Sequence, residues 1–414
     1  MYIIGIIKEH RNDEKRTPLV PEQIKYLSKK FSNLKIIVQP SNNRCFSDRD
    51  YFKNGAIINN DLNDCNLILG VKEILPSLLI PKKTYMFFSH TSKILKDNSA
   101  ASQGTPGMDK KELLKSILEK KISLIDYENI RDNNTKRYLG FGNFAGIVGC
   151  YNSLNLYLQN LSKQNWPRAH EFNSYENLKN YLKKINKENF NNARFLVTGD
   201  GRVSKGCLEL LNLLKIKKIS PKEFLENDYS EAVYCNLVTS EYVKYNDKNF
   251  DLKHFINNPT KYKSIINKYM LKTDMLISAH YWDPNSPKLF NKNDIKNYKD
   301  LKVIGDITCD INGSIPTTNR SSTIENPYYF IDKLNFEEKN YNEINKDNKL
   351  SIMAVDNLPS ELPRDSSKEF GSGLVQEVLP YLITKDDGRI KKATIAENGS
   401  FCKKYNYLTK YFQS

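Results

Sequence analysis

The stretch ARFLVTGDGRVSKGCLELLNLLK, residues 193–215, decides the fold. Its first part is an apolar run, its middle is a glycine turn at 199–201, and its last part has the pattern of an amphipathic helix. Glycine in a strand-to-helix turn permits positive φ and lets backbone N–H groups approach a pyrophosphate, and the helix N-terminus adds the positive end of its dipole. The stretch therefore predicts a dinucleotide-binding turn, with four expected contact residues: Gly199, Gly201, Arg202 and Val203.

The spacing of this motif leaves two questions open. Its glycines follow G-x-G-x-x-x-x-G rather than G-x-G-x-x-G, so a tight turn without a ligand is the alternative interpretation. An acidic residue about 20 positions further on would favour NAD by binding the ribose 2′-hydroxyl. The segment KKISPKEF at 217–224 offers Ser220 and lysines instead, so we expect NAD or NADP, with Ser220 as a further cofactor contact.

Alternating strands and helices extend outward from this stretch in both directions. The first third of the chain predicts five strands, and the second α/β region adds three before a charged, turn-rich segment at 335–350. We expect an α/β fold of two Rossmann-like, doubly wound domains with a cleft between them. The expected domains are 1–145 together with 352–414, which holds the substrate, and 146–351, which holds the dinucleotide. The expected strands are 2–7, 34–39, 66–71, 84–89 and 122–127, then 232–239, 274–279 and 303–307, and finally 351–356.

Charged residues follow several strands of the first domain. In parallel sheets ligands bind at the carboxyl ends of the strands, so these side chains are expected to meet at one site. A solitary histidine or lysine at a strand end is more often structural, and the prediction depends on the whole set. The set is Arg16, Lys72, Glu73, His90, Lys93, Lys136 and Arg137.

Composition limits the other classes of function. The net charge of +15, from 63 Lys and Arg against 48 Asp and Glu, is spread along the chain rather than gathered, so we do not expect a nucleic-acid partner. No run of 18 apolar residues is present, and the apolar N-terminus lacks a basic region, so we expect no membrane segment and a cytoplasmic location. The seven cysteines form no CxxC pair and the five histidines show no ligand spacing, so neither disulfides nor a metal are expected.

Several motifs carry a resemblance to a known family. They include KRTPLVPE, LILGVKE, TYMFFSHTSK, GFGNFAGIVG, LVTGDGRVSKG, YWDPNSPKLF, GDITCDINGSI and VDNLPSELPRDSS. With them the chain resembles the lysine-forming saccharopine dehydrogenases and the lysine–ketoglutarate reductase half of the bifunctional lysine-degrading enzyme, within the superfamily of alanine dehydrogenase and transhydrogenase. The resemblance covers nearly the whole chain. It implies NAD(P)-dependent oxidation of saccharopine at its secondary amine, which yields lysine and 2-oxoglutarate.

The resemblance also implies roles for single residues. Lys72 and His90 would be the acid–base pair, and Glu73 would adjust Lys72. Asp306 would lie near the nicotinamide and Asp310 near the substrate amine, while His280 and Trp282 would line the pocket or pack in the core. Substrate carboxylates would bind Arg16, Lys93, Lys136 and Arg137.

Some alternatives and departures remain. An alanine-dehydrogenase-like deaminase of a small 2-amino acid is the alternative enzyme, and a non-catalytic NAD(P)-binding regulator is the alternative outside enzymes. The loop at 94–109 is longer than the resemblance implies and is interpreted as a lid or a neutral insertion. The direction of the reaction and the oligomeric state stay open at this point.

Overall fold

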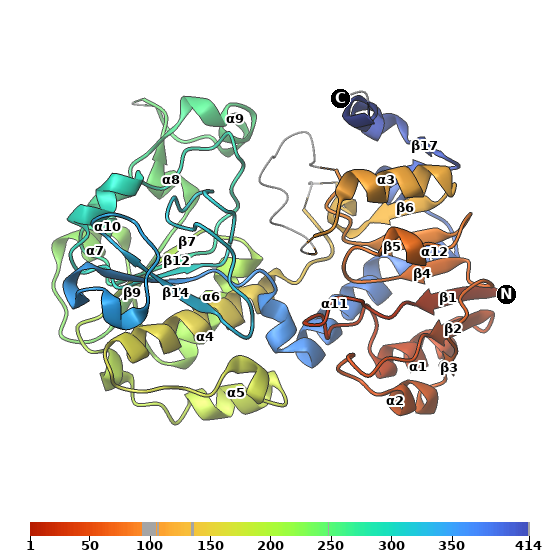
Figure 1. Ribbon diagram of the computed structural model, residues 1–414, viewed down its shortest axis with the longest axis horizontal. Coiled ribbons are helices and arrows are strands. Elements are labelled where there is room, and N and C mark those ends of the chain that lie inside the picture. The colour runs from red at the N-terminus through yellow and green to blue at the C-terminus, as the bar shows by residue number, and fades with distance from the viewer. Residues whose placement is uncertain (93–104, 106, 134–135, 247, 413–414) are drawn as a thin grey trace. The chain divides into compact units, whose positions relative to one another are not determined.

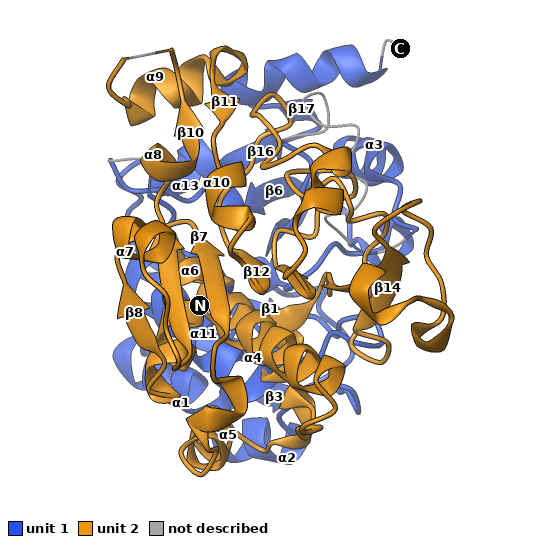
Figure 2. Ribbon diagram, turned by 90° about the vertical axis from the view of Figure 1, so that its left-hand side faces the viewer, with its two compact units in different colours: residues 1–141, 363–414 blue, residues 142–362 orange. Residues whose placement is uncertain are grey.

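The chain folds into two compact α/β units in the computed structural model, which describes residues 1–92, 105, 107–133, 136–246 and 248–412 (Figures 1 and 2). Unit 1 comprises residues 1–141 and 363–414, and unit 2 comprises 142–362. The sequence predicted that the chain returns from the second domain to the first between residues 351 and 352. In the structure the return lies between 362 and 363, because the strand β15 (Lys349–Met353) pairs with β13 (Val303–Asp306) inside unit 2.

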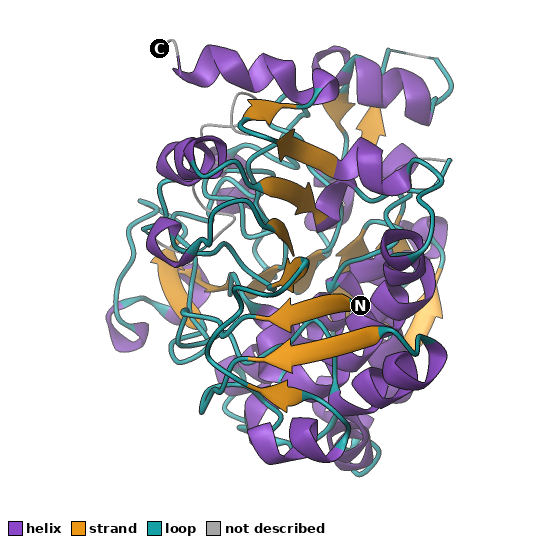
Figure 3. Cartoon of the chain, turned by 90° about the vertical axis from the view of Figure 1, so that its right-hand side faces the viewer, coloured by secondary structure: helices purple, strands orange, loops and turns teal. Residues whose placement is uncertain are grey.

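Unit 1 is built on an eight-stranded sheet with the order β17-β16-β6-β5-β4-β1-β2-β3. Figure 3 draws strands as orange arrows and helices in purple. Its six strands from β6 to β3 are parallel, and the chain reverses direction across the sheet between β1 and β4, a topological switch point. The C-terminal strands β16 and β17 extend it in antiparallel fashion. The strands are β1 (Tyr2–Ile6), β2 (Leu34–Val38), β3 (Ile57–Ile58), β4 (Leu67–Leu69), β5 (Thr84–Phe87), β6 (Ser123–Asp126), β16 (Thr394–Glu397) and β17 (Ser400–Phe401).

The helices of unit 1 follow ordinary sequence rules. The helix α1 begins with Pro21 in its first turn, ends on Lys29 and Lys30, and buries Ile24 and Leu27 against the sheet. The segment from 363 to 383 forms two helices rather than one, because Pro380 in the first turn of α12 cannot continue α11. The helices are α1 (Pro21–Lys30), α2 (Asp48–Lys53), α3 (Lys110–Glu119), α11 (Pro363–Glu377), α12 (Leu379–Ile383) and α13 (Arg389–Ala393), with the 3₁₀ helices η1 (Pro76–Leu78), η3 (Tyr127–Asn129) and η11 (Lys403–Phe412).

Unit 2 has a seven-stranded sheet with the order β14-β15-β13-β12-β7-β9-β8. All its strands except β14 are parallel, and β7, the strand of the glycine turn, lies between β9 and β12. The strands are β7 (Arg194–Thr198), β8 (Lys217–Ile219), β9 (Val233–Leu237), β12 (Met275–Ser278), β13, β14 (Tyr328–Asp332) and β15, and a separate antiparallel pair is β10 (Val243–Lys244) with β11 (Lys263–Ser264).

Helix α4 (Gly142–Asn160) is almost entirely buried and packs against α6 (Arg202–Leu213). The two helices approach closely because each has a glycine at the crossing. A Cβ on Gly146 would lie 1.9 Å from the carbonyl oxygen of Val203, and one on Gly206 would lie 2.1 Å from that of Asn143. Gly206 therefore serves helix packing. The other helices are α5 (Tyr175–Leu182), α7 (Pro221–Glu226), α8 (Thr239–Tyr242), α9 (Leu252–Asn257) and α10 (Asn267–Met270), with the 3₁₀ helices η4 (Ala169–Glu171), η5 (Lys187–Phe190), η6 (Pro259–Lys261), η7 (Lys292–Asn297), η8 (Tyr341–Glu343), η9 (Lys346–Asn348) and η10 (Leu358–Glu361).

Candidate active site and nucleotide cavity

Unit 1 gathers titratable side chains at the carboxyl edge of its sheet. Lys72 and Glu73 follow β4 and His90 follows the neighbouring strand β5, so the strand order brings the three positions together. Lys72 is half-buried, and its positive charge contributes to lowering the pKa values of both Glu73 and Glu14. This edge is the place where parallel sheets hold their ligands.

Glu73 and His90 form a buried pair. Nδ1 of His90 lies 2.6 Å from Oε1 of Glu73, and Oε2 of Glu73 accepts hydrogen bonds from the backbone N and the hydroxyl of Thr105 at 3.0 and 2.9 Å. Burial alone would raise the pKa of Glu73, but the charge and hydrogen bond of His90 outweigh it and hold that pKa at about 2. Both carboxylate oxygens thus have protein partners, and the geometry makes Glu73 a positioning group for the imidazole.

Two further residues at this edge, Glu9 and His10, were missed by the sequence analysis. Glu9 accepts hydrogen bonds from the backbone N–H groups of Val71 and Lys72 at 2.6 and 3.1 Å, and burial together with the charge of Glu14 raises its pKa to about 8. Burial lowers the pKa of His10 although the charge of Glu73 opposes it. Both follow β1, so the strand-end rule that selected Lys72 would also have found them.

Two acidic residues, Asp126 and Glu128, lie at the end of β6 and just after it. Asp126 is fully buried and accepts hydrogen bonds from the backbone and hydroxyl of Ser89 and, at 2.8 Å, from the backbone of Glu128. Burial and the charge of Glu128 raise the pKa of Asp126 to about 6, against the opposing effects of Ser89 and His90. Sequence reasoning missed Asp126 because it reads as the polar last residue of an apolar strand.

The described basic side chains that were expected to bind substrate carboxylates differ in their burial and in their partners. Arg16 is buried, its guanidinium pairs with Glu14 through two nitrogens, and its charge lies 4.2 Å from the centre of the Phe141 ring. Arg137 forms an ion pair with Glu128 at 3.0 Å. Lys136 has an exposed side chain, and Lys93 lies outside the described residues, as does nearly all of the loop at 94–109.

In unit 2 the glycine turn borders a cavity of about 490 Å³ at the carboxyl edge of the sheet. Gly199 has φ +99°, and a Cβ there would lie 2.7 Å from the carbonyl oxygen of Ala279, so only glycine fits. Gly201 precedes α6, and a Cβ there would meet open space. The lining includes the expected residues Gly199, Gly201, Arg202 and Val203, together with Thr239, Phe255, Ile256 and His280.

His280 lines this cavity, and Trp282 is not among its lining residues. Nδ1 of His280 lies 2.8 Å from the hydroxyl of Thr198, and burial lowers the pKa of the imidazole to about 4. The ring is therefore neutral near pH 7.

Ser220 does not line the cavity, and the reason is the strand order. The chain continues from α6 into β8, but β8 is the outer strand, and β9 is the neighbour of β7. The position that follows the neighbouring strand is therefore Thr239, which does line the cavity. Ser220 instead begins α7, where its hydroxyl accepts from the backbone of Glu223 at 3.2 Å and donates to its carboxylate at 2.7 Å.

Asp306 is the last residue of β13, Asp310 follows the strand, and both side chains are buried. The carboxylate of Asp306 accepts hydrogen bonds from the hydroxyls of Thr308 and Thr318 at 2.5 and 2.6 Å and from the backbone of Cys309 at 3.2 Å. Burial raises its pKa against these bonds. Asp306 thus holds the loop after β13, and neither aspartate lines the cavity beside the glycine turn.

The described ranges contain neither a membrane-spanning helix nor a metal-binding cluster. No helix there is long and apolar enough to cross a membrane. No group of three or more His, Cys, Asp or Glu side chains there is arranged to hold a metal ion.

The two α/β units, the second of which carries a glycine turn beside a cavity, define a class of protein, the two-domain α/β proteins with a turn of the dinucleotide-binding type. The family model described as "Alanine dehydrogenase/PNT, N-terminal domain" matches residues 5–148, and the model described as "Alanine dehydrogenase/PNT, C-terminal domain" matches residues 232–404. The chain belongs to the alanine dehydrogenase/PNT family.

Curated relatives confirm the resemblance that the motifs carried. The chain is 29% identical to the mitochondrial alpha-aminoadipic semialdehyde synthase of Bos taurus over 96% of this chain and 46% of that protein, and 29% identical to the Arabidopsis thaliana synthase over 100% of this chain and 42% of that protein. It thus spans less than half the length of these synthases. It is also 23% identical to a saccharopine dehydrogenase [NAD(+), L-lysine-forming] of Schizosaccharomyces pombe, covering 88% of this chain and 89% of that one.

Solved structures confirm the fold. An L-alanine dehydrogenase matches with a TM-score of 0.64 at 14% identity, over 99% of both chains. A transhydrogenase from Sinorhizobium meliloti matches with a TM-score of 0.60 at 12% identity, over 97% of this chain and 100% of that chain. Both support the expected α/β fold with two Rossmann-like domains.

Proposed function

We propose that this chain is a lysine-forming saccharopine dehydrogenase, that is, a lysine–2-oxoglutarate reductase. The observation that carries the proposal is the group of Lys72, Glu73 and His90 at neighbouring strand ends, found in a chain whose curated relatives include alpha-aminoadipic semialdehyde synthases and lysine-forming saccharopine dehydrogenases. The reaction joins hydride transfer at the secondary amine of saccharopine to hydrolysis of the imine, which releases lysine and 2-oxoglutarate.

The side chains of unit 1 supply the proton transfers in this proposal. Lys72 accepts the proton of the secondary amine as hydride leaves the adjacent carbon. His90 activates the water that adds to the imine and then returns a proton to the departing amine of lysine. Glu73, bound to Nδ1, fixes the orientation of the ring and leaves Nε2 for the proton transfers. The proposal requires that the substrate held by these residues reach the nicotinamide held by unit 2.

The cavity of unit 2 fits a nicotinamide nucleotide, NAD or NADP, which supplies the hydride acceptor when bound. The glycine at 199, where a side chain would clash with Ala279, lets the backbone approach a pyrophosphate, and the N-terminus of α6 follows directly. The apolar side chains of Phe255 and Ile256 give the cavity a face on which a flat base can pack.

The charges of unit 1 bear on the size of the substrate. Saccharopine has three carboxylates, so it needs more cationic contacts than alanine. Arg16 and Arg137 each hold an acidic side chain of unit 1, Glu14 and Glu128, and the substrate carboxylates would share these guanidinium groups. The alternative substrate, a small 2-amino acid, is supported by the fold match to L-alanine dehydrogenase.

The deciding experiment follows NAD(P)H absorbance with the purified protein. Saccharopine plus NAD⁺ or NADP⁺ is one arm, lysine plus 2-oxoglutarate plus NADH or NADPH is the second, and alanine, or pyruvate plus ammonia, is the third. We expect turnover in the first two arms. Turnover with alanine alone would reject the proposed substrate, and nucleotide binding without turnover in any arm would favour the non-catalytic regulator.

A further inference from the structure

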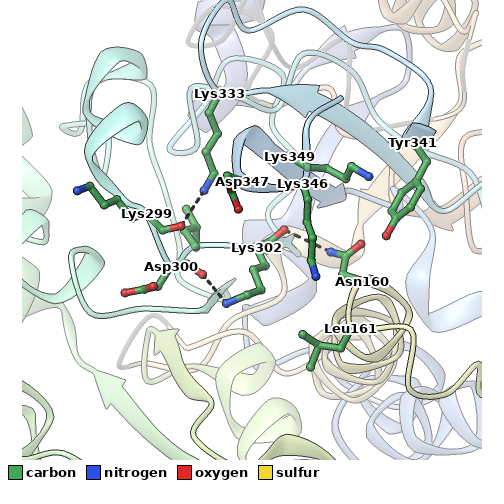
Figure 4. A pocket seen from close by; sticks show the side chains of 11 residues that line it. Asn160, Leu161, Lys299, Asp300, Lys302, Lys333, Tyr341, Lys346, Asp347 and Lys349 are labelled. Carbon is green, nitrogen blue, oxygen red and sulfur yellow. Dashed lines mark hydrogen bonds between the residues drawn. The ribbon is translucent and has the colours of Figure 1, made fainter. Parts of the chain in front are cut away.

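A second cavity of unit 2, of about 200 Å³, lies at the amino-terminal edge of the sheet (Figure 4). Lys302 directly precedes β13, Lys349 is the first residue of β15, and Lys333 directly follows the antiparallel strand β14, so all three mark the same edge. The nucleotide cavity lies at the opposite edge, after β7, β9 and β12. The two cavities have no lining residue in common.

Lysine dominates this second cavity. The lining has five lysines and two aspartates, a difference of three positive charges, and no arginine is among the lining residues. The charged lining residues are Lys299, Lys302, Lys333, Lys346, Lys349, Asp300 and Asp347. They come from three separate segments, the loop before β13, the end of β14 and the chain from η9 into β15, which Figure 4 draws together. The ammonium group of Lys302 is paired with Asp274 at 2.7 Å, and that of Lys349 lies 3.2 Å from the centre of the Tyr341 ring.

The structure fixes the most buried of these lysines in place. Lys333 is only 5% exposed, its ammonium donates to the carbonyl oxygens of Tyr298 at 3.0 Å and Lys299 at 3.4 Å, and its backbone N donates to Asn348 at 2.8 Å. An ammonium has three N–H donors, so these two bonds leave one donor. A surface lysine that serves only solubility is neither buried nor anchored in this way.

The lysines also repel one another. Burial and the charge of Lys302 lower the pKa of Lys333 to about 8, and burial and the charge of Lys346 lower the pKa of Lys349. Like charges that are held together against their repulsion are commonly part of a binding site, since an anion removes the cost.

We propose that this cavity binds a phosphate group, either inorganic phosphate or the phosphate of a small metabolite, at a site separate from the nucleotide cavity. Lysines that line one small cavity from separate segments suit a compact dianion, whereas a carboxylate is better matched by the planar fork of arginine, which is absent from the lining. The cavity is smaller than the roughly 300–1,000 Å³ typical of pockets for larger ligands, which also favours a small anion.

The test is calorimetric titration of the full chain with inorganic phosphate, AMP and succinate at constant ionic strength. Lys299→Gln/Lys346→Gln removes two exposed lysines of the cavity, and Lys222→Gln/Lys268→Gln removes two exposed lysines that line neither cavity. We expect saturable phosphate binding in the wild type and in the second double variant, at least ten-fold weaker binding in the first, and a comparable loss in Lys333→Met.

Only binding that the first double variant weakens is assigned to this cavity, so AMP bound beside the glycine turn does not count. Tighter binding of AMP than of phosphate at the lysine site would assign the phosphate to a metabolite, and equal or weaker binding would assign it to the free ion. Succinate bound as tightly as phosphate would overturn the proposal. So would phosphate affinity that is equal in the two double variants, or the absence of saturable binding at millimolar phosphate.

Discussion

Nδ1 of His90 lies 2.6 Å from Oε1 of Glu73, a carboxylate with no exposed surface that is also bound by Thr105. The pairing of a partly exposed imidazole with a buried carboxylate fixes which ring nitrogen carries the hydrogen and which one faces a reactant. His90 itself has φ +51°, an uncommon backbone conformation for a residue other than glycine. The strand end, the carboxylate and the backbone conformation together hold this ring in one orientation.

The first prediction concerns that carboxylate. Glu73→Gln keeps the shape but replaces an acceptor by a group that can also donate to Nδ1, so the ring loses its fixed orientation. We expect turnover to fall by roughly 10²-fold or more, with little change in nucleotide affinity. Steady-state kinetics and nucleotide titration measure this, with Glu119→Gln on the exposed face of α3 as the control. Unchanged turnover in Glu73→Gln would remove the positioning role.

The second prediction concerns the acid–base pair. Lys72→Met and His90→Gln each remove a group that carries protons, while the nucleotide cavity is formed by unit 2 alone. We expect each variant to lose roughly 10²- to 10⁴-fold in turnover and to keep the nucleotide dissociation constant within a factor of about three. Lys115→Met, at an exposed position of α3, is the matched control. A variant that turned over at the wild-type rate would have no place in the mechanism.

The third prediction compares two glycines of one turn. Gly199→Ala must force a Cβ to within 2.7 Å of Ala279 at φ +99°, whereas Gly201→Ala meets open space at φ −80°. We expect Gly199→Ala to lower the free energy of unfolding by about 1–3 kcal/mol and Gly201→Ala to change it by less than about 0.5 kcal/mol. Both should weaken nucleotide binding, since the second Cβ lies where the pyrophosphate approaches. Denaturant unfolding and nucleotide titration separate the two effects.

Much of this fold could be predicted because parallel strands are nearly continuous apolar runs. The five strands expected in the first domain correspond to β1, β2, β4, β5 and β6. The strand-end rule also selected Lys72 and His90, which follow the neighbouring strands β4 and β5. The contact between Glu73 and His90 could not be read from the sequence, because it depends on side-chain directions at two loop residues.

Strand order is the part that the sequence could not supply. The rule for the ribose contact assumes that the second strand along the chain pairs with the first, and it therefore selected Ser220 after β8. In this chain the third strand, β9, takes that place, and Thr239, which follows it, lines the cavity. Nothing in the local pattern of either strand distinguishes an inner strand from an outer one, since the choice depends on how the helices between them pack.

The fourth prediction is a pH dependence of stability due to His280. Burial lowers its pKa to about 4, below the value near 6.5 expected in the unfolded chain. As the pH falls from 6.5 to 4, the imidazole binds a proton in the unfolded state but stays largely unprotonated in the folded state. The free energy of unfolding therefore decreases by about 2–3 kcal/mol because of this group. His280→Gln should lose less stability over this window than the wild type. Parallel slopes for the two proteins between pH 6.5 and 4 would contradict the burial of a neutral ring.

The fifth prediction distinguishes Thr239 from Ser220. Thr239 follows the strand beside β7 and lines the nucleotide cavity, whereas Ser220 begins α7 and exchanges hydrogen bonds with Glu223. Thr239→Val should weaken nucleotide binding several-fold, because it removes a hydroxyl at the position where the ribose is held in doubly wound folds. Ser220→Ala should leave binding unchanged but lower the free energy of unfolding by about 1 kcal/mol, the usual cost of losing an N-cap. The opposite assignment of effects would show that the strand that follows α6, rather than the neighbour of β7, carries the ribose contact.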